Sequence, residues 1–199
     1  IIHNQTNLGN AANIIAGYRW GVESGADIVG CMDADGEHSP YGLLRHLRWI
    51  ESGKYDGVAG SIIFPDHNAN HHDRNMMRLY GGLQAELAGV DGLFYIQSPG
   101  YNLHRSEFVR AALDLYTGYA ATFAEGEMPR WGMHGVMIHL LARGAGARIK
   151  AAYLECFGQS PNRTPDKLML QAGAAQTHLV RLVKFLEDRN QSADLRAIG

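Results

Sequence analysis

The chain has 199 residues, of which 46% are hydrophobic and 19% are charged, so it can bury a sizeable core and is not a disordered polypeptide. Its formal net charge of −2 argues against the basic surface that nucleic-acid binding requires, so no nucleic-acid partner is expected. No apolar run approaches the ~20 residues of a membrane-spanning helix, and the first residues lack the features of a signal peptide. Together with two widely separated cysteines, which favour free thiols, these features predict a soluble, cytoplasmic protein.

Strand-like and helix-like patterns alternate along the chain. In order, they predict a strand at 1–4, a helix at 11–24, a strand at 27–32, a helix starting at 39, a strand at 55–63, a helix at 74–89, a strand at 94–98, a turn at 99–102, helices at 106–115 and 132–142, a strand at 148–155 and a helix at 168–186 before a frayed tail. This order predicts an α/β fold in which helices flank a mostly parallel sheet, within a single domain spanning 1–199. Because an apolar strand opens the chain with no element to cover its edge, we expect that an N-terminal piece is missing.

Two carboxylates one residue apart, Asp33 and Asp35, end the apolar run at 27–32. Such a strand delivers acids to the carboxyl end of a parallel sheet, where open α/β sheets bind their ligands. Residue alternation places both carboxylates on the same side of the chain, where they can share Mg²⁺ or Mn²⁺. Because a bound cation neutralises a diphosphate, chemistry on a phosphorylated substrate is the leading hypothesis.

Other interpretations of Asp33 and Asp35 compete with this one. In a solvated turn, the two acids would be loop formers only. A calcium loop of the EF-hand type is excluded, because the sixth and twelfth positions counted from Asp33 hold His38 and Leu44 instead of glycine and glutamate. The segment also resembles the Asp-x-Asp-Gly of haloacid-dehalogenase-type phosphatases, in which Asp33 would be the nucleophile and Asp35 the acid and base.

Four segments carry a further resemblance: 7–13 before a helix, 25–40 with the two carboxylates, 53–61, and 98–105. They closely resemble the nucleotide-sugar glycosyltransferases of the GT-A fold, and within them the large inverting family (family 2) that includes the polyprenyl-phosphate sugar transferases. The resemblance covers about residues 1 to 150. Relatives begin with a strand and a helix that hold the nucleotide base, so the resemblance implies a chain that lacks this first strand and helix.

The resemblance implies a nucleotide-sugar site around the carboxylates. In relatives, the first acid approaches the ribose and the metal, while the second coordinates the cation that bridges the diphosphate; these roles fall on Asp33 and Asp35. Mn²⁺ or Mg²⁺ would then stabilise charge on the departing nucleoside diphosphate. Asn7 and Gly9 match the turn near the nucleotide, although Gly9 also suits a plain helix-start turn.

The same resemblance points to further charged residues. Arg105 matches a basic position on the acceptor side, and Arg163 resembles the basic loop that closes over the diphosphate. Relatives place an acid as general base where this chain has His134, so His134 is one candidate base; Glu125 or Glu127, reaching in from a loop, is another. If the acceptor is already a phosphate, it needs little help from a base.

These features predict a metal-dependent enzyme that transfers a sugar from a nucleoside diphosphate sugar to a saccharide, a lipid phosphate or another acceptor. Peripheral association with a membrane stays open. The alternatives are the phosphatase and a non-catalytic sugar- or nucleotide-binding domain. The missing first strand and the presence of His134 in place of an acid motivate the last of these.

Overall fold

The computed structural model describes residues 9–34, 38–63, 82–83, 85–91, 97–129, 131–155 and 165–198. Its helices are α1 (Gly9–Glu23), α2 (Leu43–Glu51), α4 (Ser106–Ala120), α5 (Met133–His139) and α6 (Pro165–Ile198). Short helical turns η1 (Pro40–Gly42) and η2 (Leu140–Gly144) precede α2 and follow α5. The strands are β1 (Ile28–Met32), β2 (Gly57–Ile63), β3 (Gln97–Arg105) and β4 (Ile149–Glu155).

Some predicted elements lie outside these residues. The predicted strand at 1–4 is one of them, as is most of the predicted helix at 74–89, of which the described residues 82–83 and 85–88 are helical. Only the last two residues of the predicted strand at 94–98 are described, and they belong to β3.

The sheet has the strand order β1-β3-β2-β4 among the described residues. β3 pairs antiparallel with β1 and with β2, whereas β2 pairs parallel with β4. Consequently β1, β2 and β4 run in one direction, as predicted for a mostly parallel sheet, and β3 runs against them between β1 and β2. The carboxyl ends of β1, β2 and β4 therefore share one edge of the sheet, which we call the carboxyl edge.

The predicted turn at 99–102 is wrong, because these residues lie within β3. The local signal came from Pro99 and Gly100, which favour turns. Pairing with β1 overrides it, since Tyr101 lies opposite Met32 in a regular ladder. On the other side of β3, the ladder with β2 shifts register between Ala59 and Ser61.

Helix α1 ends where the sequence predicts. Gly25 follows the helix with φ +78°, and the Ala26 amide donates to the Gly21 carbonyl at 3.3 Å, a common way to close a helix. Within the helix, Tyr18 is 2% exposed and Trp20 is 60% exposed, so the face that carries Tyr18 packs against the rest of the protein. On the same helix, Gly21 lies directly against Val29 of β1, where an added Cβ atom would come within 2.7 Å of the valine side chain.

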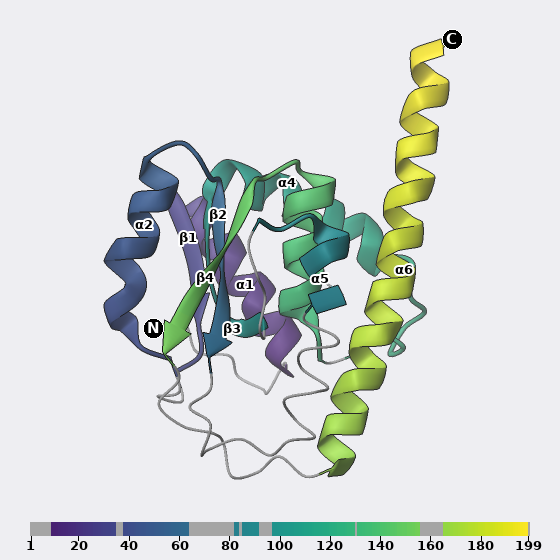
Figure 1. Cartoon of the computed structure of the whole chain (residues 1–199). Helices are drawn as coiled ribbons and strands as arrows, with labels where there is room; N and C mark the ends of the chain where they lie inside the picture. The colour runs from purple at the N-terminus through teal and green to yellow at the C-terminus, as the bar shows by residue number, and fades with distance from the viewer. Residues whose placement is uncertain are drawn as a thin grey trace.

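Helices cover both faces of the sheet (Figure 1). α2 covers one face, where Ile50 packs with Val58 and Leu103 of the strands. α1, α4 and α5 cover the other face and form a larger apolar cluster that includes Tyr119 and Leu182.

The long helix α6 lies beside α5, on the outside of this second layer (Figure 1). It continues to Ile198, so the predicted frayed tail is helical instead. Within the described parts of the chain, no helix has both the length and the apolar character needed to cross a membrane.

Candidate functional site

Asp33 directly follows β1 at the carboxyl edge of the sheet, as the apolar run before it predicts. Its backbone amide donates to the carbonyl oxygen of Gly100 in β3 at 2.8 Å, which extends the ladder by one pair beyond Met32. The Asp33 side chain is 41% exposed. A partly exposed carboxylate on a tethered backbone suits ligand binding at this edge.

His38 lies beside Asp33. Its Nε2 atom lies 4.0 Å from Asp33 Oδ2, and its side chain is only 4% exposed. Sequence reasoning did not single out His38 as a site residue, and its spacing of five residues from Asp33 does not by itself indicate that it is buried there.

His134 lies at the start of α5, after Gly132, which has φ +87°. It is 6% exposed, and among the described residues its Nδ1 atom has no hydrogen-bond partner. Burial, with a smaller contribution from the charge of neighbouring His38, lowers the pKa of His134 to about 4. His134 is therefore neutral at physiological pH and a weak base.

Glu127, the other candidate base, contacts α6. Its carboxylate lies 3.9 Å from Arg181 and accepts a hydrogen bond from the Ala124 amide at 3.4 Å. Arg181 in turn donates to the Thr122 carbonyl at 2.6 Å and lies over the Phe123 ring. None of these contacts involves Asp33 or His134, and together they hold the loop after α4 against α6.

Arg105 is not brought together with Asp33. It pairs with Ile28 at the start of β1, five residues along β3 from Gly100, a span of roughly 17 Å. Its guanidinium donates to the carbonyl of Ile50 in α2 at 2.5 Å. Arg105 thus lies at the opposite edge of the sheet, where it joins α2 to β3.

The remaining predicted site residues are only partly described. Gly9 starts α1 with φ +81°, a conformation that favours glycine whether or not a nucleotide lies nearby. Asn7, Asp35 and Arg163 lie outside the described residues. Within the described parts of the chain, no three His, Cys, Asp or Glu side chains gather closely enough to form a metal site on their own.

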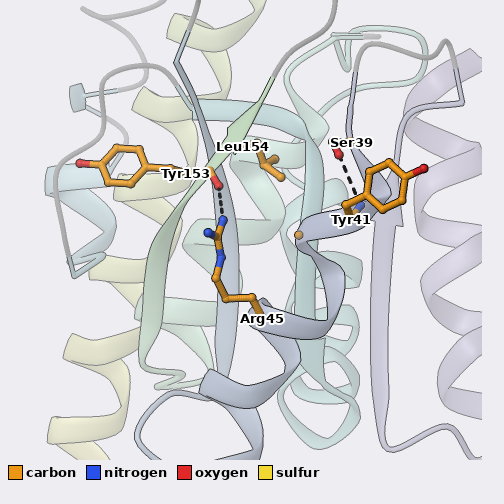
Figure 2. A pocket seen from close by; sticks show the side chains of 6 residues that line it. Ser39, Tyr41, Arg45, Tyr153 and Leu154 are labelled. Atoms are coloured by element: carbon orange, nitrogen blue, oxygen red, sulfur yellow. Dashed lines mark hydrogen bonds between the residues drawn. The ribbon is translucent and has the colours of Figure 1, made fainter.

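A cavity of about 270 Å³ lies on the α2 side of the carboxyl edge (Figure 2). Ser39, directly after His38, and Arg45 line it together with Tyr41 and the end of β4. Figure 2 shows Arg45 reaching from α2 to the backbone of β4, where it donates to the Tyr153 carbonyl at 3.3 Å. Among the described lining residues, Arg45 carries the charge, and the first turn of α2 holds no acid to offset it.

A second cavity of about 250 Å³ lies between α1 and β1 and is lined by Asn13, Tyr18 and Cys31, among others. The Tyr18 hydroxyl donates to Asn102 Oδ1 of β3. Burial, and secondarily the charge of Asp33, raises the pKa of the Cys31 thiol to about 11. Cys31 is a free, protonated thiol as predicted, whereas Cys156 lies outside the described residues.

Comparison with known proteins identifies relatives for the first half of the chain. A family model described as glycosyl transferase family 2 matches residues 1–111. The undecaprenyl-phosphate mannosyltransferase of Micrococcus luteus is 34% identical over 113 residues, which make up 56% of this chain and 45% of that protein. The polyprenol monophosphomannose synthase of Mycolicibacterium smegmatis is 36% identical over 65 residues, 33% of this chain and 24% of that protein. The chain thus spans less than half the length of these curated relatives.

Proposed function

This chain belongs to glycosyl transferase family 2, and on that premise we propose that it transfers a sugar from a nucleoside diphosphate sugar to a lipid phosphate. The observation that carries the proposal is the position of Asp33, which is tethered to β3 and half-exposed at the carboxyl edge. Both matched relatives are named for sugar transfer involving a polyprenyl phosphate.

The donor diphosphate requires a positive counter-charge, which we assign to a divalent cation. Asp33 offers hard carboxylate oxygen atoms, the ligand type that Mg²⁺ and Mn²⁺ prefer, and its partial exposure leaves room for such an ion. Asp35, one residue beyond Ala34, is proposed as the second ligand. When bound, the cation would stabilise negative charge on the departing nucleoside diphosphate.

A phosphate acceptor agrees with the weak basicity of His134, one of the candidate bases among the described residues. Transfer to a sugar hydroxyl needs a base whose pKa lies near the working pH, and the pKa of His134 is about 4. A phosphate monoester is already ionised at neutral pH, so its oxygen atom can attack without a strong base. This favours a lipid phosphate over a saccharide as the acceptor.

The cavity beside Arg45 supplies a group that can bind the acceptor phosphate. The Arg45 guanidinium donates one hydrogen bond to the Tyr153 carbonyl. A guanidinium has further N–H donors, which suit phosphate oxygen atoms. Ser39 lines the same cavity and directly follows His38, so the cavity adjoins the segment that contacts Asp33. We therefore assign the acceptor phosphate to this side of the carboxyl edge.

Transfer can be tested by incubating the protein with radiolabelled GDP- and UDP-sugars, Mn²⁺ and a polyprenyl phosphate, and counting label in the lipid phase. We expect label from one donor, its loss on adding EDTA, and its loss in Asp33→Asn but not in the control Asp114→Asn, which alters an exposed acid on α4. Phosphorylation of Asp33 by a phosphate ester would instead establish the phosphatase. Donor binding with no transfer to any acceptor would establish a binding domain.

A further inference from the structure

We propose that Gly100 and His38 are positioning residues that hold the Asp33 carboxylate in place at the carboxyl edge. The use we give to that carboxylate, cation and diphosphate binding, rests on the proposed function. The positioning itself is argued from contacts between β1, β3 and the segment before α2.

Gly100 is required because the Asp33 side chain occupies the space above it. A Cβ atom added to Gly100 would lie 2.5 Å from Asp33 Cγ and 2.7 Å from His38 Nε2, both closer than a real Cβ approaches such atoms. The bare backbone at this position therefore lets the carboxylate lie directly on β3. Any larger residue at position 100 must displace Asp33, His38 or both.

The backbone hydrogen bond makes this contact specific. Because the Asp33 amide donates to the Gly100 carbonyl at 2.8 Å, the backbone of Asp33 cannot move away from β3 without breaking that bond. The backbone of β3 at Gly100 thus limits the movement of the Asp33 carboxylate on one side. A side chain ordered before its ligand arrives loses less conformational entropy on binding.

His38 closes a second side of the carboxylate. Its side chain is 4% exposed and points Nε2 toward Asp33 Oδ2 at 4.0 Å, while the same Nε2 lies against Gly100. The charge of His38 also contributes to lowering the pKa of His134, at the start of α5. The segment after β1 is in this way coupled to both β3 and α5.

A matched pair of glycine variants tests the role of Gly100. Gly100→Ala is compared with Gly60→Ala, whose added Cβ would meet Leu154 and, at 3.1 Å, the Tyr101 carbonyl of the same sheet. Both variants should unfold at lower temperature than the wild type. We expect at least tenfold weaker Mn²⁺ binding, measured by electron paramagnetic resonance, in Gly100→Ala and a change below twofold in Gly60→Ala.

Three histidine variants test the role of His38. His38→Ala should weaken Mn²⁺ binding about tenfold, and His38→Gln, whose amide nitrogen can replace Nε2, should recover most of the loss. The control His178→Ala removes another buried histidine, which contacts the Tyr119 hydroxyl at 2.7 Å, and should leave Mn²⁺ binding unchanged.

Hydrogen exchange in the metal-free protein separates this inference from the proposed function. In Gly100→Ala and His38→Ala, the Asp33 amide should exchange at least tenfold faster, while the Arg105 amide, bonded to the Asp56 carbonyl at the far edge, keeps its wild-type rate. If the wild-type protein binds no Mn²⁺, the cation has no part in the proposed function. The difference in exchange between the Asp33 and Arg105 amides would still support the positioning of Asp33. An Asp33 amide that exchanges at the wild-type rate in both variants would overturn it, as would equal losses of Mn²⁺ binding in the control variants.

Discussion

The carboxylates at the two edges of the sheet differ in their exposure and in their hydrogen bonds. At the amino end of β2, Asp56 is 8% exposed and accepts three hydrogen bonds from Arg148, two from the guanidinium and one from the backbone amide, at 2.8 to 2.9 Å. Hydrogen bonding to Arg148 lowers the pKa of Asp56. At the carboxyl edge, Asp33 is 41% exposed and lies beside a histidine. A buried carboxylate whose oxygen atoms accept several hydrogen bonds within the protein stabilises the packing of its elements. A carboxylate that is held in position but partly exposed can bind a ligand.

The largest expected effect is on activity at the carboxyl edge. Asp33→Asn removes the charge while keeping the size of the side chain, so sugar transfer should fall at least about 100-fold, the usual scale for losing one group that stabilises developing charge. The unfolding temperature should stay within about 2 °C of the wild type, because the exposed carboxylate contributes little to folding. Transfer assays and differential scanning calorimetry measure the two. If the unfolding temperature of Asp33→Asn falls by much more than this, Asp33 stabilises the fold as Asp56 does, and the two edges do not differ.

The converse holds for the opposite edge. Asp56→Asn replaces one carboxylate oxygen atom by an amide nitrogen that donates instead of accepting. At least one hydrogen bond from Arg148 is therefore lost, and we expect the unfolding temperature to fall by about 5 °C. The kcat of the folded enzyme should remain near wild type at a temperature well below unfolding. If kcat instead falls as far as in Asp33→Asn, the two edges do not divide structure from function.

Buried histidines should make stability depend on pH. Burial lowers the pKa of His104, on β3, to about 3, and among the described residues neither of its ring nitrogen atoms has a hydrogen-bond partner. Below pH 6.5, His104 of the unfolded chain binds a proton that His104 of the folded protein does not. The free energy of unfolding should therefore decrease as the pH is lowered, and this group should account for a decrease of roughly 2 kcal/mol at pH 5. Urea unfolding of wild type and His104→Leu from pH 7 to pH 5 measures the slope, which should be shallower in the variant. Equal slopes would exclude His104 as a source.

The smallest expected effect concerns the cavity beside α2. Arg45→Gln keeps a hydrogen-bond donor but removes the charge, so the KM for polyprenyl phosphate should rise about fivefold, close to 1 kcal/mol, with kcat and the KM for the donor nearly unchanged. Arg48→Gln, another exposed arginine of α2 that does not line the cavity, is the matched control. Equal effects in both variants would indicate general attraction by α2 rather than a phosphate subsite.

The position of Asp33 could be predicted from sequence because it depends on a local pattern, an apolar strand ending in an acid. The place of β3 could not, since Pro99 and Gly100 signal a turn and only pairing with β1 makes them extended. The role of Arg105 on the acceptor side stays a prediction from the resemblance; its position at the edge opposite to Asp33 depends on the antiparallel direction of β3, which the sequence does not reveal.

Residues that act through packing were also missed. Neither the need for a glycine at position 100 nor the burial of His38 has a signature in the sequence alone, because both arise where segments more than 60 residues apart meet. Asp35 and Arg163 stay predictions from sequence, as does the single domain. For Glu127, the structure offers a local role in the contact with Arg181 that a sequence pattern does not reveal.

The insertion of β3 between β1 and β2 also bears on how the protein is made. During synthesis, β1 and β2 emerge well before residues 97–105, the strand that joins them in the described sheet. Contacts between distant segments slow folding, and exposed strand edges in the meantime favour aggregation. The ribosome must therefore deliver residues 97–105 before Asp33 can acquire its partner strand, so the position of Asp33 at the carboxyl edge should be among the later features of the nascent chain to form.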